Sequence, residues 1–205
     1  MTTTPHVRQR AFDLTNRLAH TNDGVALVEF AFVLPILFLI YIGSSQLCDA
    51  IGAQRKVTLT TRTIGDLVSR KLDANPTVVP NIAPSELQAD FQASSNTMTP
   101  YSATGLSGTV SDIKITSVTT TGGVTTSTGS VQWSNGYNTT KLVANSVYTL
   151  SGSYPINSYV IVVSTNYTYT PTMGATYIGN IPMSDNIVFF PRNSATSANI
   201  TCSAC

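Results

Sequence analysis

The chain has 205 residues, a length that allows one ordinary domain together with a membrane anchor. Charged residues make up only 10% of the chain, compared with about 25% in an average soluble domain, and the formal net charge is +1. No cluster of Lys and Arg alternates with aromatic residues, so we set aside a nucleic-acid partner. Thr, Ser and Asn crowd the C-terminal two thirds, and such an uncharged polar surface favours a domain outside the cytoplasm.

Residues 24 to 47 form an apolar run that is long enough to cross a bilayer, whose hydrocarbon core requires about 20 helical residues. Its only ionisable groups are the Glu29 carboxylate and the Tyr41 phenol. A cleaved secretory signal has a shorter apolar region, of about 7 to 15 residues. The run therefore predicts one membrane-spanning helix over residues 25–47, with the lipid bilayer as its surroundings.

The basic residues around this span do not decide its orientation. Three precede it and three follow it, namely Arg8, Arg10, Arg17, Arg55, Lys56 and Arg62. The polar, Thr-rich sequence after the span is typical of a translocated domain. We therefore expect a cytoplasmic N-terminus and a C-terminal domain on the other side of the membrane, which is the periplasm if the protein is bacterial.

Gly24, Glu29 and Phe30 reproduce the spacing G-x-x-x-x-E-F/Y, which resembles the type IV prepilin motif. In that family a membrane-embedded prepilin peptidase cuts after the glycine. The resemblance implies that residues 1–24 are a cytoplasmic leader and that Val25 becomes the mature N-terminus. The alternative is an ordinary single-span anchor with a glycine at its start and a glutamate at the lipid interface.

The position of Glu29 has a physical interpretation that does not depend on the family. A carboxylate near the hydrocarbon core is costly unless it finds a partner, so intramembrane acids are functional candidates by default. Cleavage after Gly24 would create an α-amino group on Val25 at about the same membrane depth. The amine of one subunit could then pair with Glu29 of the next and set the register of an array.

The stretch VEFAFVLPILFLIYIG, with Pro35 in the middle of the span, resembles the N-terminal signature of the TadE-like family. These proteins are minor pseudopilins of the Tad/Flp (tight adherence) pilus system. The resemblance covers about residues 20 to 70 and returns more weakly at 166–171 and 189–192. It implies a single-pass protein of the bacterial inner membrane that acts in pilus assembly, priming or surface adhesion. The implied partners are the prepilin peptidase, other pilin or pseudopilin subunits and the inner-membrane assembly platform.

The span is predicted to continue into a periplasmic stem helix over residues 48–72. Apolar residues recur there at helical spacing and form one stripe, which comprises Ala53, Val57, Ile64, Val68 and Leu72. Gly52, Gly65 and the Thr-rich patch at 58–63 are the places where this helix would break.

A Pro-rich linker over residues 73–84 is expected next, because prolines at this spacing cannot lie in a helix interior. Pro84 and Ser85 predict the start of a second helix, with Ser85 and Gln88 in capping-box spacing. Leu87, Phe91 and Met98 give this helix one apolar face.

Alternating residues predict a small antiparallel sheet for the second helix to pack on. Residues 113–116 and 131–134 are expected to pair as a hairpin, and Asn135-Gly136 is interpreted as a turn. Residues 159–169 are β-branched or aromatic on both faces and predict a strand inside the sheet.

Residues 187–190 predict a last strand, and 137–150 stay ambiguous between helix and strand. The expected fold class is α+β, a pilin-like lollipop with an α+β domain over residues 85–205.

The sequence indicates no catalytic centre, metal site, cofactor or small-molecule substrate. Both histidines, His6 and His20, lie in the leader, and the acids after the span are scattered without a spacing typical of acid–base chemistry or metal binding. Trp133, Tyr167 and Tyr169 are interpreted as packing residues. An enzyme is therefore not expected.

Cys202 and Cys205 end the chain as a C-x-x-C pair. A thioredoxin-type pair lies at a helix N-terminus after a strand, and that framework is missing here, so a structural disulfide is the favoured interpretation. Cys48 is the odd thiol, either free or cross-linked to a neighbour. Two alternatives to a pseudopilin stay open: an unprocessed, signal-anchored envelope binding or adhesion domain, and a membrane-tethered thiol oxidoreductase.

Overall fold

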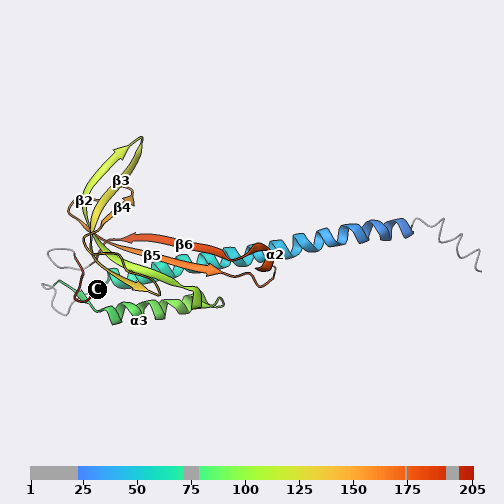
Figure 1. Ribbon diagram of the computed structural model, residues 1–205, viewed down its shortest axis with the longest axis horizontal. Coiled ribbons are helices and arrows are strands. Elements are labelled where there is room, and N and C mark those ends of the chain that lie inside the picture. The colour runs from blue at the N-terminus through green and yellow to red at the C-terminus, as the bar shows by residue number, and fades with distance from the viewer. Residues whose placement is uncertain (1–22, 72–78, 174, 193–198) are drawn as a thin grey trace, which may run out of the picture. The chain divides into compact units, whose positions relative to one another are not determined.

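The computed structural model describes residues 23–71, 79–173, 175–192 and 199–205 (Figure 1). The chain divides into two compact units at the junction between Cys48 and Asp49. Most of the predicted leader, with His6 and His20, lies outside the described residues, and so do residues 72–78 of the predicted stem end and linker. The architecture is α+β with a long N-terminal apolar helix, which confirms the expected fold class.

Helix α2 (Asp23–Ser69) contains Pro35 and supplies all the described residues of the first unit. It ends at Ser69, before the expected end at Leu72. Neither the glycines nor the threonines interrupt it. The hydroxyls of Thr60, Thr61 and Thr63 each donate a hydrogen bond to the carbonyl four residues earlier, so these side chains are satisfied inside the helix.

The two glycines of α2 in the second unit lie where another side chain approaches the helix closely. A Cβ at Gly52 would collide with the phenol of Tyr101, and a Cβ at Gly65 would collide with the ring of Phe189. Glycine is used at both positions because any larger residue would push these rings away. Gly52 and Gly65, where the helix was expected to break, are therefore the points at which Tyr101 and Phe189 approach it.

Five antiparallel strands form the main sheet, in the spatial order β4-β3-β2-β5-β6 (Figure 1). They are β2 (Ser107–Thr121), β3 (Val124–Tyr137), β4 (Val147–Ser151), β5 (Tyr159–Tyr169) and β6 (Ile181–Phe189). The predicted pairing of 113–116 with 131–134 is confirmed, since Ile113 lies opposite Val131. The strand over 159–169 is also confirmed and has neighbours on both sides.

The predicted turn at Asn135-Gly136 is wrong. Both residues lie inside β3, where Asn135 pairs with Val110. The hairpin reverses instead at Gly122 and Gly123, which have φ angles of 60° and 81°. Two successive residues with positive φ suit a tight hairpin turn, and glycine adopts that conformation without steric cost.

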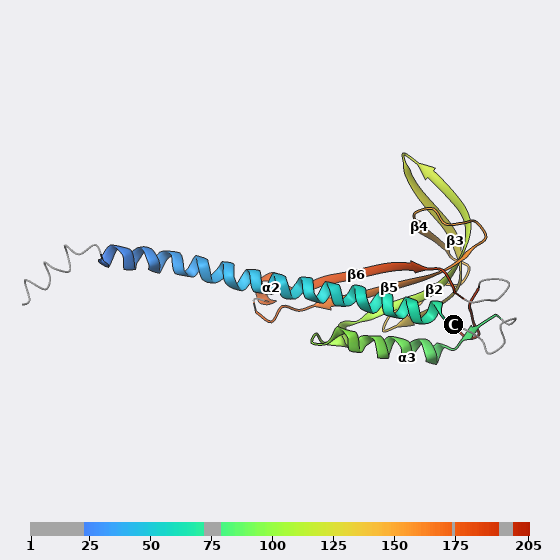
Figure 2. The same ribbon diagram turned by 180° about the vertical axis from the view of Figure 1, so that it is seen from behind.

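One face of the sheet is covered by two helices, the second-unit part of α2 and α3 (Pro84–Ser95) (Figures 1 and 2). The stripe predicted for α2 is buried as expected at Ala53, Val57, Ile64 and Val68, each with no exposed surface. From α3 and the 3-10 turn that follows it, Leu87, Phe91 and Met98 are fully buried. The other face carries a separate apolar cluster of β2, β3, β4 and β5 residues.

The start of α3 differs from the predicted capping box. Its N-cap is Ala83, with Pro84 in the first turn, and no side chain caps the helix. Gln88 does not reach back to the helix start. Its side-chain amide donates to the Asn135 side chain and to the Gly136 carbonyl, at 3.0 and 2.9 Å. A contact across the fold has replaced the local one.

Part of the predicted linker is a strand. Residues of β1 (Asn81–Ile82) pair in parallel with β7 (Thr201–Cys202), so the segment before α3 is tied to the end of the chain. The indole N–H of Trp133 donates to the carbonyl of Ile200 at 2.6 Å and holds the same C-terminal segment from the core side. Trp133 is 6% exposed, in agreement with its predicted packing role.

The segment over 137–150, left open by its sequence, contains the irregular stretch after β3 and most of the short strand β4. The last strand of the sheet is longer than the predicted 187–190, because β6 begins at Ile181 and ends at Phe189. Among the remaining elements are the 3-10 turns η1 (Asn96–Met98) and η2 (Ala103–Gly105) and the short helix α4 (Ala175–Ile178).

Candidate functional site

The residues predicted to direct processing and assembly lie in the first three turns of α2. Gly24, Val25, Glu29 and Phe30 are all exposed, and a Cβ placed on Gly24 would meet no other atom. Val25 and Glu29 are four residues apart, so they share one face of the helix and are separated by about 6 Å along its axis. A new amine at Val25 would therefore lie one turn from the carboxylate.

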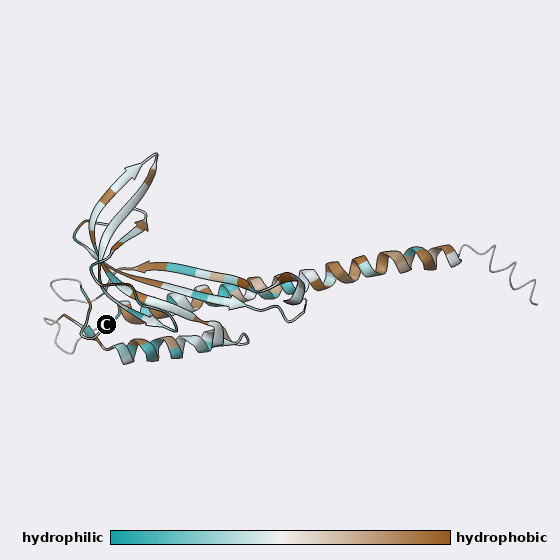
Figure 3. Cartoon of the chain, viewed as in Figure 1, coloured by the Kyte–Doolittle hydropathy of each residue, from teal (hydrophilic) through white to brown (hydrophobic). Residues whose placement is uncertain are grey.

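The first unit exposes a large apolar surface, and its contact with water would be thermodynamically unfavourable. Its large apolar and aromatic side chains from Val25 to Tyr41 are 41 to 74% exposed, and the next residue, Ile42, is partly buried. Figure 3 shows the N-terminal part of this helix as mostly hydrophobic, and none of its most apolar stretch is buried. Apolar patches of this kind mark contact with lipid or with other proteins. The helix is a single-pass membrane anchor by length and composition.

Pro35 lies inside this apolar helix without ending it. A proline has no backbone N–H, so the carbonyl of Ala31, four residues earlier, loses its helical hydrogen bond. Neighbouring helices can satisfy such a carbonyl in a membrane. Pro35 therefore adds a polar backbone group to the side of a helix that is otherwise apolar.

The cysteine pair belongs to the second unit. Cys202 and Cys205 form a disulfide, with Cys202 in β7 and the pair packed partly against the core that contains Trp133. The Lys141 ammonium donates to the Cys205 carbonyl at the end of the chain. Cys48 is exposed and forms no disulfide in the structure.

Among the residues that the structure describes, no group of three or more His, Cys, Asp or Glu side chains could hold a metal ion. One acid was missed by the sequence reasoning. Asp112 in β2 is completely buried, and burial raises its pKa to about 8, against a weaker opposing effect of the Ile113 backbone N–H. No local pattern marked this burial, because Asp112 precedes the predicted strand segment over 113–116, whereas β2 begins at Ser107.

Asp112 does not form a catalytic pair across the sheet. The residues opposite it on the two neighbouring strands are Trp133 and Ile161, neither of which has a titratable side chain. Neither carboxylate oxygen has a well-formed hydrogen bond within the described parts of the chain. Burial therefore favours the neutral form of Asp112, so that its ionisation should affect stability.

Comparison with known proteins identifies the N-terminal segment. Residues 24–65 match the model of a family described as TadE-like protein, which confirms the resemblance seen in the sequence. The matched region contains the Gly24–Glu29 spacing, the apolar span and most of the second-unit part of α2, and it ends before α3 and the sheet. No curated protein and no solved structure matches the chain. The similarity is therefore limited to this N-terminal segment.

Proposed function

We propose that this protein is a minor pseudopilin of a Tad/Flp-type pilus that acts in pilus assembly, priming or surface adhesion and has no enzymatic activity. The observation that carries the proposal is the exposed apolar helix that presents Gly24 and Glu29 at prepilin spacing inside the TadE-like segment. The helix is inserted in the bacterial inner membrane, with the N-terminus in the cytoplasm and the α+β domain in the periplasm. The Thr-rich, weakly charged composition of that domain supports this orientation.

A prepilin peptidase cleaves the chain after Gly24. Gly24 supports the proposal, because a protease must take the scissile segment in an extended form, which glycine adopts readily at the start of α2. Cleavage leaves Val25 as the first residue of the mature protein. Its amine then pairs with Glu29 of a neighbouring pilin or pseudopilin, which removes the cost of an isolated carboxylate at the membrane.

Mass spectrometry of the mature N-terminus tests the processing step. In cells that contain a prepilin peptidase we expect the chain to begin at Val25, and in a peptidase-deficient strain we expect the leader to remain. Substitution of Gly24→Val should block cleavage, because it adds a side chain at the cut. Substitution of Gly43→Val in the same helix is the matched control, since a Cβ there also meets no other atom. An intact leader in peptidase-positive cells would refute the processing step and favour an unprocessed, signal-anchored adhesion domain.

The association with the pilus is tested separately. Surface fibres are sheared from cells, purified and probed for this chain alongside the membrane fraction. Recovery with the fibres indicates a pilus subunit, whereas recovery in the membrane together with the assembly platform indicates a role in the machine. Unchanged piliation in a strain that lacks the gene, with the chain absent from fibres and from platform complexes, would contradict the proposed function.

A further inference from the structure

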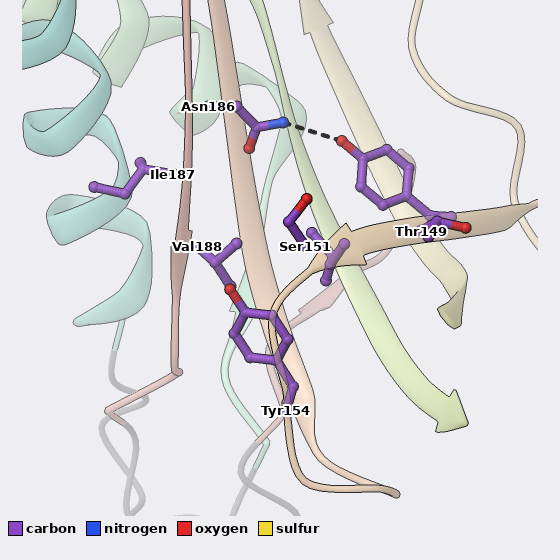
Figure 4. Close-up of a pocket in the computed structure, with 8 residues that line it drawn as sticks. Thr149, Ser151, Tyr154, Asn186, Ile187 and Val188 are labelled. Atoms are coloured by element: carbon purple, nitrogen blue, oxygen red, sulfur yellow. Dashed lines mark hydrogen bonds between the residues drawn. The ribbon is translucent and has the colours of Figure 1, made fainter. Parts of the chain in front are cut away.

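The two outer strands of the sheet, β4 and β6, approach one another although they are not paired. The side-chain amide of Asn186 in β6 donates to the phenol oxygen of Tyr148 in β4 at 3.2 Å (Figure 4). Because the strands are at opposite ends of the order β4-β3-β2-β5-β6, this contact requires the sheet to curl. The curl forms a partly open pocket of about 490 Å³ between the two strands.

This pocket has the size of a small-molecule site. Its volume falls in the range of about 300 to 1,000 Å³ that is usual for ligand pockets. It is lined by residues of β4, the turn after β4 and β6, and none of them is charged. Tyr148 and Tyr154 contribute partly exposed rings, and Leu150 and Val188 contribute apolar surface. Hydrogen-bonding groups come from the tyrosine phenols and the Asn186 amide, whereas Thr149 and Ser151 alternate with Tyr148 and Leu150 along β4 and are exposed.

The turn that carries Tyr154 is held in place before any ligand binds. The buried hydroxyl of Ser127 donates to the Gly152 carbonyl and accepts the Tyr154 backbone N–H, both at 2.9 Å. Gly152 has a φ of 107°, which glycine adopts without strain. The Tyr154 ring also lies 6.1 Å from the ring of Phe190, at a tilt of 50°. Such preorganisation lowers the entropy that binding must offset.

We propose that the pocket between β4 and β6 binds a neutral saccharide. A pyranose ring has an apolar C–H face, which suits a tyrosine ring, and a rim of hydroxyls, which suits phenol and amide groups. The absence of charge from the lining disfavours an anionic or cationic ligand, because a buried charge needs a partner. Asn186 is exposed, and Figure 4 shows its amide directed at Tyr148, so a ligand hydroxyl can share this hydrogen bond.

This inference is independent of the proposed role in a pilus, and the test uses purified protein alone. The full-length chain is reconstituted in phosphatidylcholine nanodiscs, which avoids detergents with sugar headgroups. Glucose, galactose, mannose and N-acetylglucosamine are titrated by calorimetry and saturation-transfer NMR, with glucuronic acid and sialic acid as charged comparators. Disaccharides and immobilised neutral glycans are a second arm, which separates binding of a free sugar from binding at the end of a glycan.

Saturable binding of at least one neutral sugar is expected, with a dissociation constant of about 0.1 to 10 mM for a small and partly wet pocket. Tyr154→Ala should weaken binding about tenfold or more, because it removes the ring that the sugar stacks on. Asn186→Ala should weaken it as well. Ser184→Ala is the matched control, since Ser184 is an exposed polar residue of the same strand that does not line the pocket, and it should leave affinity unchanged.

Fluorescence of the single tryptophan, Trp133, verifies that each variant is folded. If the Tyr154→Ala variant does not fold, Tyr154→Phe is used in its place. This variant keeps the ring and removes one hydroxyl, so a partial loss of sugar affinity is expected. The proposal is overturned if no neutral sugar or glycan binds, if only the acidic sugars bind, or if the pocket variants bind as tightly as the Ser184→Ala control.

Discussion

Asp112 on β2 lies directly opposite Trp133 on β3, and both side chains are buried. The indole N–H of Trp133 donates to the Ile200 carbonyl rather than to the carboxylate. Within the described residues, neither oxygen of Asp112 has a well-formed hydrogen bond. Burial therefore favours the neutral form of this acid and raises its pKa from 3.8 to about 8.

This acid should make the folded state less stable as pH rises. Between pH 3.8 and about 8 the unfolded chain has lost the proton of Asp112 and the folded chain still holds it. The folded state then binds one more proton, so the free energy of unfolding falls with increasing pH, by about 1.4 kcal/mol per pH unit. Below this window the contribution is constant, and above it the full penalty of a buried carboxylate remains.

Asp112→Asn is the variant that isolates the effect. The amide has nearly the same shape and cannot ionise, so the decline of stability over this window should be much smaller than in the parent protein. Denaturant unfolding of the full-length chain in nanodiscs, followed by Trp133 fluorescence from pH 4 to 9, gives the comparison. Equal slopes for the two proteins would mean that another group causes the pH dependence.

Gly65→Ala should destabilise the folded protein, whereas a Gly→Ala substitution in a helix usually stabilises it. In an exposed helix interior, alanine is more stable than glycine by about 1 kcal/mol. Here the added Cβ collides with the Phe189 ring, and overpacking of this kind costs about 1 to 3 kcal/mol. In a Phe189→Ala background the same substitution should become neutral or stabilising. A double-mutant cycle of unfolding free energies measures the coupling, and additive effects would contradict the contact.

Removal of the disulfide should have a modest and local effect. Cys202 and Cys205 are three positions apart, and closing so short a loop is expected to contribute about 2 kcal/mol. The double variant Cys202→Ser/Cys205→Ser should lower the unfolding free energy by up to this amount. Cys48→Ser is the matched control and should have no effect, since Cys48 is exposed.

Thiol labelling of the unreduced protein separates a structural disulfide from an oxidoreductase. Only Cys48 should react if the Cys202–Cys205 bond is stable. Rapid exchange of that bond with a dithiol at neutral pH would instead support the membrane-tethered thiol oxidoreductase.

Glu29 should matter for assembly and not for membrane insertion. Glu29→Gln removes the charge and keeps the size, and Glu29→Val removes all polarity, so both remain compatible with an apolar helix. We expect normal amounts of membrane-inserted chain and a decrease of about tenfold in the chain recovered with pilus or platform complexes. Carbonate extraction measures insertion, and co-purification measures assembly. If both variants are recovered with pilus or platform complexes in the same amount as the wild-type chain, the Glu29 carboxylate has no role in setting the register.

Periodic patterns in the chain were sufficient to predict much of the fold. The stripe from Ala53 to Val68, the strand over 159–169 and the pairing of Ile113 with Val131 all follow from spacings of 3.6 or 2 residues. Such spacings determine which face of an element is apolar. That face can be predicted to be buried without knowing which element packs on it. The prepilin spacing and the apolar span are likewise local, and they are the segment that the family comparison recognises.

The failures occurred where a residue's partner lies far away in the chain. Asn135-Gly136 has the composition of a turn, but pairing with β2 and the amide of Gln88 hold it in a strand. Gln88 has capping-box spacing, yet its hydrogen bonds across the fold replace the cap.

What the sequence alone determined is therefore the membrane helix, the fold class and the amphipathic faces, because each depends on neighbours a few residues apart. Only the tertiary structure decided why Gly65 faces Phe189, why burial favours the neutral form of Asp112 and how β4 and β6 form a pocket. These properties depend on atoms brought together by the curl of the sheet and by the helices packed on it. Their distances and burial are set by the whole fold, and no local pattern encodes them.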